Sequence, residues 1–218
     1  MSPNFGGKMK VLLLVAHPAL ERSRMNRRLL DAVSALKGVT CHDLYEQYPD
    51  LGIDVKREQE LLLAHDAVVF QSPFYWYSTP AILKEWQDLV LTHGWAYGAG
   101  GTALAGKVTF NALTTGGPAA SYTASGHNRF SVRALLAPYE ATAHLCGMRF
   151  LAPFVVHGVL RFRRDEDYDG PCHAYQRVIE ALTQDRLDLD IAASLLQLDP
   201  EAGAIIRAPQ EATEGRAF

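Results

Sequence analysis

The chain has 218 residues, of which 48% are hydrophobic and 21% are charged, and its formal net charge is −3. This composition is typical of a globular domain that buries its core without disulfides, and the weak charge disfavours nucleic acid as a partner. No run approaches the roughly 18 apolar residues of a membrane helix, and we find no secretory leader. The three cysteines are scattered without metal-ligand spacing. We therefore expect a cytoplasmic protein without a metal site, and a peripheral position at the inner membrane stays open.

Short apolar runs alternate along the chain with segments of helical periodicity. The runs predict buried strands, and the periodic segments predict helices. The expected strands are 10–16, 39–44, 67–71, 108–113 and 149–156, the last interrupted by Pro153. The expected helices are 23–36, 55–64, 80–91, 130–146 with a bend at Pro138, and 168–187.

This alternation predicts an α/β fold with a doubly wound parallel sheet of five strands and helices on both faces. A closed eight-stranded barrel would need about 250 residues. Beyond residue 187 the composition shifts toward Ala, Gln, Asp and Glu. We therefore divide the chain into a domain at 9–187 and a C-terminal extension at 188–218, which we expect to hold a short helix near 191–198 and then a weakly ordered tail. Ligands of such sheets bind beyond the carboxyl ends of the strands.

The end of the first strand predicts an anion site. His17 follows the strand, and Ser23, Arg24, Met25 and Asn26 open the next helix. Free backbone N–H groups and the positive end of the helix dipole point at such a loop. The loop is neither a P-loop nor the GxGxxG turn of dinucleotide-binding folds. The alternatives are a plain helix cap at Ser23 and a loop histidine bonded to backbone at His17.

Two further strand ends carry unusual residues. The third strand is followed by Pro73, Phe74, Tyr75, Trp76 and Tyr77, and the fourth by Thr114, Thr115, Gly116 and Gly117, with Tyr122 and His127 shortly after. Bare glycine backbone lets N–H groups approach a flat or anionic ligand, and successive aromatics in a loop are typical of a ligand site or an interface. An ordinary turn and a hydrophobic loop packed on the next helix are the alternatives.

A phosphate site at the first strand end and a flat slot between the other two predict flavin mononucleotide as the ligand. Its ring system needs backbone donors where reduction builds negative charge. No adenosine site is evident, which favours FMN, although FAD stays open. The long segment 92–107, with Trp95 and Tyr97 among glycines, predicts a wall shared by two copies in a homodimer.

Several stretches resemble the flavodoxin-like NAD(P)H:quinone oxidoreductases, and most of all the bacterial ancillary proteins of glutathione-regulated potassium-efflux systems. The stretches are AHP at 16–18 with SRMN at 23–26, LYEQYPD at 44–50, QSPFYWYSTPAILKEWQD at 71–88, HGWAYGAGGTALAGK at 93–107 and TTGG at 114–117. The resemblance covers about 10–187 and implies the flavodoxin-like strand order 2-1-3-4-5.

The resemblance also implies an activity and residue roles. It implies that NAD(P)H reduces bound FMN, which then passes two electrons to a quinone or similar planar acceptor in a ping-pong reaction. It puts the flavin phosphate on His17 and Ser23–Asn26, and the flavin ring against Pro73–Trp76 and Thr114–Gly117. It implies that Tyr122 and His127 stabilise charge on the flavin, as a Tyr and a His follow Thr-Thr-Gly-Gly at similar spacing in the mammalian quinone reductases of this family. Here the interval is slightly shorter, and Pro118 follows the glycine pair. A solvated loop histidine is the alternative for His127.

Two other functions compete with the enzyme. The resemblance implies a regulatory subunit that binds the cytosolic domain of a potassium-efflux antiporter. A flavodoxin-type electron carrier is disfavoured, because carriers are usually strongly acidic. The sequence leaves open FMN against FAD, NADH against NADPH, the natural acceptor and the role of the C-terminal extension.

Overall fold

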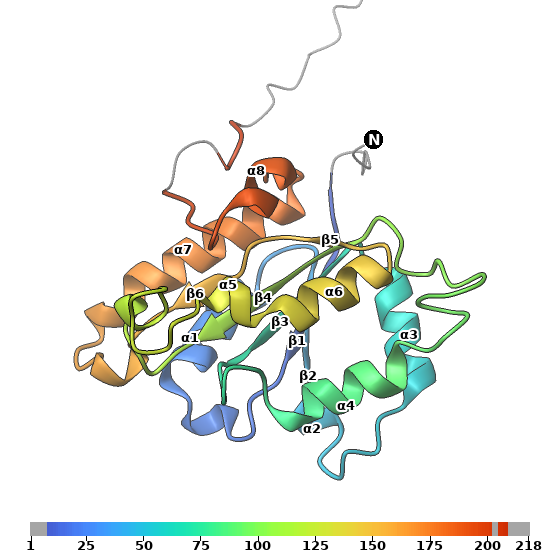
Figure 1. Ribbon diagram of the computed structural model, residues 1–218, viewed down its shortest axis with the longest axis horizontal. Coiled ribbons are helices and arrows are strands. Elements are labelled where there is room, and N and C mark those ends of the chain that lie inside the picture. The colour runs from blue at the N-terminus through green and yellow to red at the C-terminus, as the bar shows by residue number, and fades with distance from the viewer. Residues whose placement is uncertain (1–7, 202–204, 209–218) are drawn as a thin grey trace, which may run out of the picture.

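The computed structural model describes residues 8–201 and 205–208 of the chain. Its six strands form one parallel sheet in the order β2-β1-β3-β4-β5, with β6 also paired to β4 (Figure 1). The strands are β1 (Val11–Val15), β2 (Val39–Asp43), β3 (Ala67–Pro73), β4 (Val108–Thr114), β5 (Arg149–Phe150) and β6 (Phe154–Val156). The predicted flavodoxin-like α/β fold and its strand order are confirmed.

Helices cover both faces of the sheet (Figure 1). One face carries α1 (Arg24–Ser34), α7 (Glu166–Thr183) and α8 (Leu189–Ser194). The other carries α2 (Leu44–Gln47), α3 (Val55–Ala64), α4 (Ala81–Val90), α5 (Val132–Leu135) and α6 (Ala137–Leu145). Three short 3₁₀ turns are η1 (Leu20–Arg22), η2 (Ala119–Ser121) and η3 (Val159–Arg161).

The central strands are apolar on both sides because both sides face helices. In β1, Leu13 and Val15 pack into the core beneath α1 and α7, whereas Leu12 and Leu14 pack into the core beneath α3, α4 and α6. All five residues of β1 are completely buried. A continuous apolar run is therefore the correct signature of this strand, since alternation would leave polar side chains in one of the two cores.

The predicted fifth strand is split into β5 and β6. Thr109 pairs with Phe150, whereas Ala112 pairs with Phe154. Three residues of one strand thus face two of the other, which is a bulge, and Pro153 within it has no N–H for the ladder. After the bulge, β6 pairs with the last three residues of β4 and therefore ends at the same edge of the sheet as β1, β3 and β4.

The predicted helix at 130–146 is two helices. α5 ends at Leu135, and α6 begins at Ala137 with Pro138 in its first turn. A proline there needs no N–H partner but prevents the helix from continuing through it. The helix predicted at 168–187 begins earlier and ends earlier, at Glu166 and Thr183. The four-residue α2 was not predicted.

The first part of the predicted C-terminal extension packs on the sheet. The helix expected near 191–198 is α8, which begins at Leu189 and ends at Ser194. Leu189, Leu198 and Ile205 are buried in the core that α1 and α7 cover. The backbone N–H of Leu198 donates to the carbonyl of Pro153 at 2.8 Å. The weakly ordered tail predicted at the end of the chain lies largely outside the described residues, and the division at residue 187 stays a prediction.

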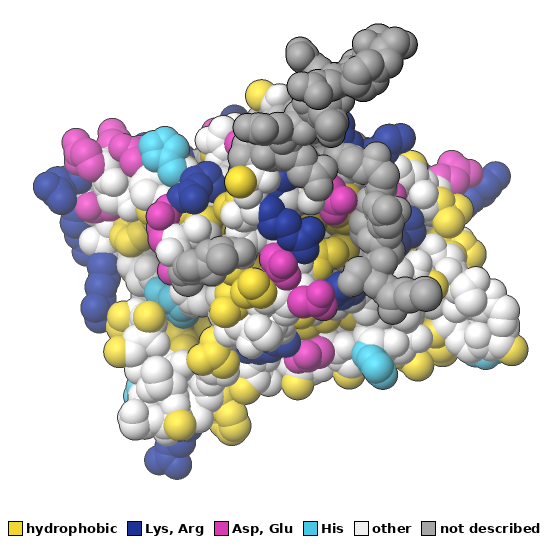
Figure 2. All heavy atoms as spheres, turned by 90° about the horizontal axis from the view of Figure 1, so that it is seen from above, with side chains coloured by type: hydrophobic (Ala, Val, Ile, Leu, Met, Phe, Trp, Pro, Cys, Tyr) yellow, Lys and Arg dark blue, Asp and Glu magenta, His cyan; other side chains and the backbone are white. Residues whose placement is uncertain are grey.

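On the face that carries α8, acidic and basic side chains lie among one another rather than in separate patches (Figure 2). Among the described helices, none is both long enough and apolar enough to cross a membrane.

Candidate flavin site

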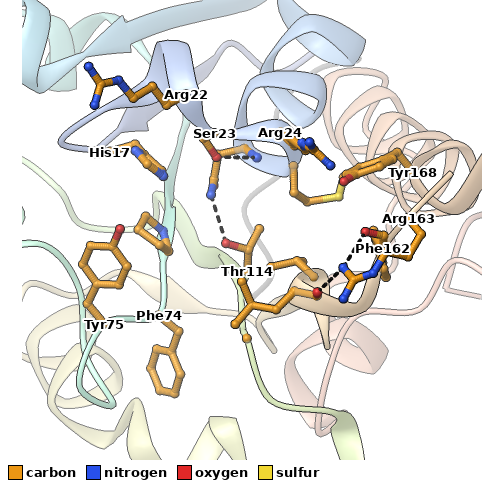
Figure 3. A pocket seen from close by; sticks show the side chains of 16 residues that line it. His17, Arg22, Ser23, Arg24, Phe74, Tyr75, Thr114, Phe162, Arg163 and Tyr168 are labelled. Carbon is orange, nitrogen blue, oxygen red and sulfur yellow. Dashed lines mark hydrogen bonds between the residues drawn. The ribbon is translucent and has the colours of Figure 1, made fainter. Parts of the chain in front are cut away.

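A cleft of about 470 Å³ opens at the carboxyl edge of the sheet, between the ends of β1, β3, β4 and β6. Its volume falls within the range of cofactor sites. Ten of the predicted site residues line it, and they are His17, Ser23, Arg24, Met25, Asn26, Pro73, Phe74, Tyr75, Thr114 and Gly116. Figure 3 shows most of these side chains around the cleft. The predicted residues Trp76, Thr115, Gly117, Tyr122 and His127 are not part of its lining.

The N-terminus of α1 forms one end of the cleft. Ser23 precedes the helix in extended conformation, and its hydroxyl accepts a hydrogen bond from the N–H of Asn26 at 3.2 Å. Ser23 is thus a helix cap, which was the alternative given for it, and its contact with a phosphate stays a prediction. The other first-turn N–H groups and the exposed Arg24 remain for an anion, which the helix dipole also favours.

Asn26 connects the helix to the sheet beneath the cleft. Its amide Nδ2 donates to the Thr114 hydroxyl at 2.9 Å, and its backbone carbonyl accepts from Gln71 at 2.9 Å. The amide oxygen Oδ1 is buried without a hydrogen-bond partner among the described residues. A buried acceptor without a partner costs about 1–3 kcal/mol, and a ligand hydroxyl in the cleft would satisfy it.

His17 is a neutral hydrogen-bond donor toward the cleft. Its Nδ1 accepts from the N–H of Ala19 at 3.1 Å, so the proton of the neutral ring sits on Nε2. Burial lowers the pKa of His17, although the nearby Glu21 opposes the change. The neutral form with Nε2–H therefore predominates near pH 7.

The aromatic segment after β3 forms a tight turn. Ser78 donates its N–H to the carbonyl of Tyr75 at 2.9 Å, and the two residues between them, Trp76 and Tyr77, have φ of 49° and 63°. Asn or Gly is the usual residue in such a turn, and left-handed backbone costs bulky residues roughly 1–2 kcal/mol each. The Trp76 side chain is 90% exposed. Strain and exposure of this kind mark a functional surface more often than a packing element.

The Thr-Thr-Gly-Gly loop after β4 forms the opposite rim. A Cβ at Gly116 would lie 2.9 Å from Cδ1 of Leu160, so glycine keeps the two segments close. Thr115 is buried, and its hydroxyl donates to the carbonyl of Gly117 at 2.8 Å. The loop is thus folded back on itself and presents bare backbone to the cleft.

Tyr122 and His127 lie behind this loop rather than in the cleft. The ring of Tyr122 is 6.1 Å from that of Phe74 and 5.5 Å from that of His157. Burial raises the pKa of Tyr122, so its hydroxyl remains a donor at neutral pH. His127 is exposed in the loop beyond Tyr122. The catalytic roles of both residues stay predictions.

Sequence reasoning missed one wall of the cleft. The missed residues are Arg22, Val159, Leu160, Phe162, Arg163 and Tyr168. Five of them follow β6, where the bulge at 151–153 obscured the strand end. The basic run at 161–164, which contributes Arg163, is visible in the sequence directly before three acidic residues.

The residues present fit FMN. The α1 terminus and Arg24 match a phosphate, and the unpartnered Oδ1 of Asn26 matches a hydroxyl of the ribityl chain. Phe74, Tyr75 and the backbone at Gly116 border the space for a flat ring.

Comparisons with known proteins agree with this geometry. The family model described as flavodoxin-like fold matches residues 9–179. An uncharacterized NAD(P)H oxidoreductase of Bacillus subtilis, YdeQ, is 52% identical over 146 residues, which are 67% of this chain and 74% of that protein. KefG of Pectobacterium atrosepticum, an ancillary protein of a glutathione-regulated potassium-efflux system, is 49% identical over 72% of this chain and 85% of its own length.

Solved structures are also similar. General stress protein 14 of Treponema denticola, in complex with FMN, has a TM-score of 0.74 and 39% identity over 79% of this chain and 99% of that chain. An NADPH-quinone reductase from P. pentosaceus has a TM-score of 0.71 and 34% identity over 78% of this chain and 97% of that chain. The chain therefore belongs to the flavodoxin-like fold family and, within it, to the group of NAD(P)H oxidoreductases and quinone reductases.

Proposed function

We propose that the protein is an FMN-dependent oxidoreductase that takes electrons from NAD(P)H and gives them to a quinone or similar planar acceptor. The observation that carries this proposal is the cleft that joins the N-terminus of α1 to a glycine rim across the carboxyl edge of the sheet. An anion site and a flat slot in one cleft are what FMN requires. The FMN complex of a protein that is 39% identical supports FMN over FAD.

The residues of the chain bind and orient the reactants. Ser23 and Arg24 hold the phosphate with the first-turn N–H groups of α1, and His17 donates from Nε2. Bound FMN would supply a ring that accepts two electrons from a nicotinamide and releases them to an acceptor. Backbone at Gly116 would stabilise the negative charge that accumulates there, and the protonated Tyr122 hydroxyl would add a donor behind the loop.

A second copy of the chain completes the acceptor pocket in this proposal. Trp76 and Tyr77 are held in strained backbone with 90% and 47% of their side chains exposed. Apolar rings in that state are suited to an interface or a planar ligand. The segment 92–107 has its own anchors in Ala96 and Leu104, which are buried, so it forms a preshaped wall. These features support a homodimer with the acceptor site at its interface.

Steady-state kinetics test the reaction order. One cleft that serves both substrates in turn predicts parallel double-reciprocal lines when NADPH is varied at several quinone concentrations. Intersecting lines would contradict a shared site, because they require both substrates to be bound together.

The predicted roles of Tyr122 and His127 can be separated by substitution. Tyr122→Phe should lower kcat about tenfold with little change in KM for NADPH, because the hydroxyl acts on developing charge. We expect His127→Gln to have a smaller effect, since this side chain is exposed, whereas Tyr122 is half-buried against Phe74, which lines the cleft. His144→Gln, exposed on α6, is the control. If Tyr122→Phe and the control have the same kcat, the Tyr122 hydroxyl does not take part in the reaction.

Regulation of a potassium-efflux antiporter is a second candidate function. The 49% identity to KefG of Pectobacterium atrosepticum supports it. Co-purification with the cytosolic domain of an antiporter encoded beside this protein would support it, and loss of co-purification in Trp76→Ala would assign the contact to the strained turn. If the protein reduces quinones but does not co-purify with the antiporter domain, this second function is wrong and the enzymatic function stands.

A further inference from the structure

A histidine that the sequence interpretation did not select lies against the predicted flavin loop. His157 follows β6 directly and is half-buried. Its Nδ1 is 3.1 Å from the Thr115 hydroxyl, its Nε2 is 3.2 Å from the amide oxygen Oε1 of Gln197, and its ring is 5.5 Å from that of Tyr122. It therefore contacts the loop, the predicted catalytic tyrosine and the C-terminal segment together.

The backbone beside His157 is bonded to the loop in both directions. Thr115 donates its N–H to Val156 at 2.9 Å and accepts from Val159 at 3.0 Å. Gly158 donates its N–H to the carbonyl of Gly117 at 2.9 Å. The loop is thus held as a continuation of the sheet. His157 lies between Val156 and Gly158, the residues that make these backbone hydrogen bonds.

Hydrogen-bond counting fixes the protonation of His157. The Thr115 hydroxyl already gives its one proton to the carbonyl of Gly117. It can therefore only accept from His157, so Nδ1 carries a proton. In the neutral ring Nε2 is then an acceptor. The structure has the amide oxygen of Gln197 toward Nε2, so this assignment requires the amide to be flipped, which places its NH₂ group toward the ring. Burial lowers the pKa of His157 and keeps the ring neutral near pH 7; the opposing contribution of Gln197 belongs to the unflipped amide.

Gln197 belongs to the segment that the family match does not cover. That match ends at residue 179. The segment is fixed in place by the buried Leu198, whose N–H donates to Pro153 at 2.8 Å, and by Ala192, whose carbonyl accepts from Ala152 at 3.0 Å. Arg133 also donates to the carbonyls of Ala193 and Leu195. The amide of Gln197 therefore reaches His157 from a rigid support.

We propose that His157 is a positioning residue for the Thr114–Gly117 loop, with its ring oriented by Gln197 from the C-terminal segment. It acts through Thr115 and does not touch the cleft itself. The relevance of this contact to flavin binding rests on the proposed function, whereas the contact itself is measurable in the chain without flavin. It gives residues beyond 187 a role in the site.

The tautomer of His157 is the first test. Two-bond ¹⁵N–¹H correlation spectra of the flavin-free chain should show the proton of His157 on Nδ1. Thr115→Val, which removes the hydroxyl and keeps the shape, should move the population toward Nε2–H, and Thr115→Ser should leave it on Nδ1. A proton on Nε2 in the unsubstituted chain would overturn the proposal.

Two substitutions of His157 separate its two hydrogen bonds. In His157→Asn the side-chain NH₂ group lies near the position of Nδ1 and can still donate to Thr115. In His157→Gln the side-chain NH₂ group lies near the position of Nε2, so the hydrogen bond to Thr115 is lost. We expect the amide hydrogens of Thr115, Gly158 and Val159 to exchange with solvent about tenfold faster in His157→Gln than in His157→Asn, which corresponds to one lost hydrogen bond. Equal exchange rates in the two variants would overturn the proposal.

Flavin titration then measures the consequence for the site. His157→Gln should bind FMN about tenfold more weakly than His157→Asn, and Gln197→Ala about threefold more weakly than its neighbour control Leu196→Ala, whose side chain is 72% exposed. FMN binding and hydrogen exchange can fail separately. If the amides exchange faster in His157→Gln but FMN binds neither the variants nor the unsubstituted protein, the proposed function is wrong and the positioning role of His157 stands. If FMN binds all variants equally, His157 does not position the flavin loop for binding, and that part of the proposal is wrong.

Discussion

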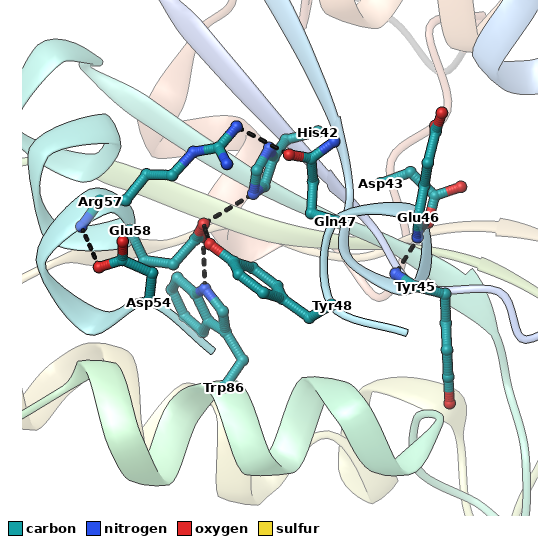
Figure 4. Close-up of polar contacts among 10 residues, drawn as sticks. All are labelled: His42, Asp43, Tyr45, Glu46, Gln47, Tyr48, Asp54, Arg57, Glu58 and Trp86. Atoms are coloured by element: carbon teal, nitrogen blue, oxygen red, sulfur yellow. Dashed lines mark hydrogen bonds and ion pairs between the residues drawn. The ribbon is translucent and has the colours of Figure 1, made fainter. Parts of the chain in front are cut away.

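A buried carboxylate holds together the face of the sheet opposite α1. Glu58 is completely buried and accepts hydrogen bonds from His42 Nε2 at 2.7 Å, the Tyr48 hydroxyl at 2.6 Å and Trp86 Nε1 at 2.8 Å (Figure 4). The four side chains come from β2, α3, α4 and the segment after α2. The two carboxylate oxygens of Glu58 thus accept hydrogen bonds from three buried donors, each on a different segment of the chain.

Removing this carboxylate should destabilise the fold. Glu58→Ala leaves three donors buried without an acceptor, so the free energy of unfolding should fall by about 3–5 kcal/mol. Urea unfolding followed by far-ultraviolet circular dichroism measures the change. Glu60→Ala on the same helix, at an exposed residue, should change it by less than about 0.5 kcal/mol. A loss in Glu58→Ala no greater than in that control would refute the structural role.

The same group predicts an acid dependence of stability. Burial alone would raise the pKa of Glu58, but the hydrogen bonds from His42, Tyr48 and Trp86 outweigh it and hold the pKa below the ordinary value. The stabilisation is therefore complete above about pH 4.3, the value of an unfolded glutamate, and is lost as the pH falls through the lower folded value. Below pH 4.3 the parent chain should lose stability more steeply than Glu58→Gln, which cannot titrate there. Parallel stability curves for the two proteins would show that Glu58 does not contribute to acid unfolding.

Gly116 tests the shape of the proposed flavin slot. A Cβ at this residue projects toward Leu160, whose flexible end is 2.9 Å away and 73% of whose side chain is exposed. Gly116→Ala should therefore weaken FMN binding about tenfold, because the added methyl group displaces Leu160 where both residues line the cleft. Stability should change by less than about 1 kcal/mol, because the exposed end of Leu160 can move aside. Addition of Leu160→Ala should restore most of the affinity. Unchanged affinity in Gly116→Ala would mean that the loop does not approach the flavin.

At the scale of elements, the sequence predicts strands better than it predicts where they bend. The bounds of α3 and the cap at Ser23 follow from local chemistry, and the structure reproduces both. The bulge at 151–153 depends on how β4 and β6 align, which is a relation between distant segments. The missed wall of the cleft follows from that bulge. A basic and aromatic run directly after the last strand, 161–164, was the available signal for it.

The C-terminal segment depends on one arginine. Arg133, with 19% of its side chain exposed, donates to the carbonyls of Ala193 and Leu195 at 2.7 Å and 2.6 Å, at the end of α8. Arg133→Ala leaves those carbonyls without this partner, so the free energy of unfolding should fall by about 2 kcal/mol and the Leu198 amide should exchange faster. Lys37→Ala, at an exposed residue, is the control. Slow exchange at Leu198 in Arg133→Ala would show that the segment is held by its buried side chains alone.

At the level of the assembly, the proposed homodimer has a second copy of the chain against the strained turn. Among residues 8–201 and 205–208, Trp76 is the most exposed large hydrophobic side chain, and Trp76→Ala should weaken self-association at least tenfold by analytical ultracentrifugation. Leu145→Ala, on the exposed side of α6, should leave association unchanged. A parent chain that is monomeric at every accessible concentration would rule out the proposed shared acceptor site.

Anaerobic spectroscopy of the purified holoprotein tests whether the chain is a flavin-dependent oxidoreductase. We expect the protein to carry FMN, one equivalent of NAD(P)H to abolish the visible flavin absorbance, and one equivalent of a quinone to restore it. A protein that takes up no FMN, or whose bound FMN stays oxidised in excess NADH and NADPH, would contradict it.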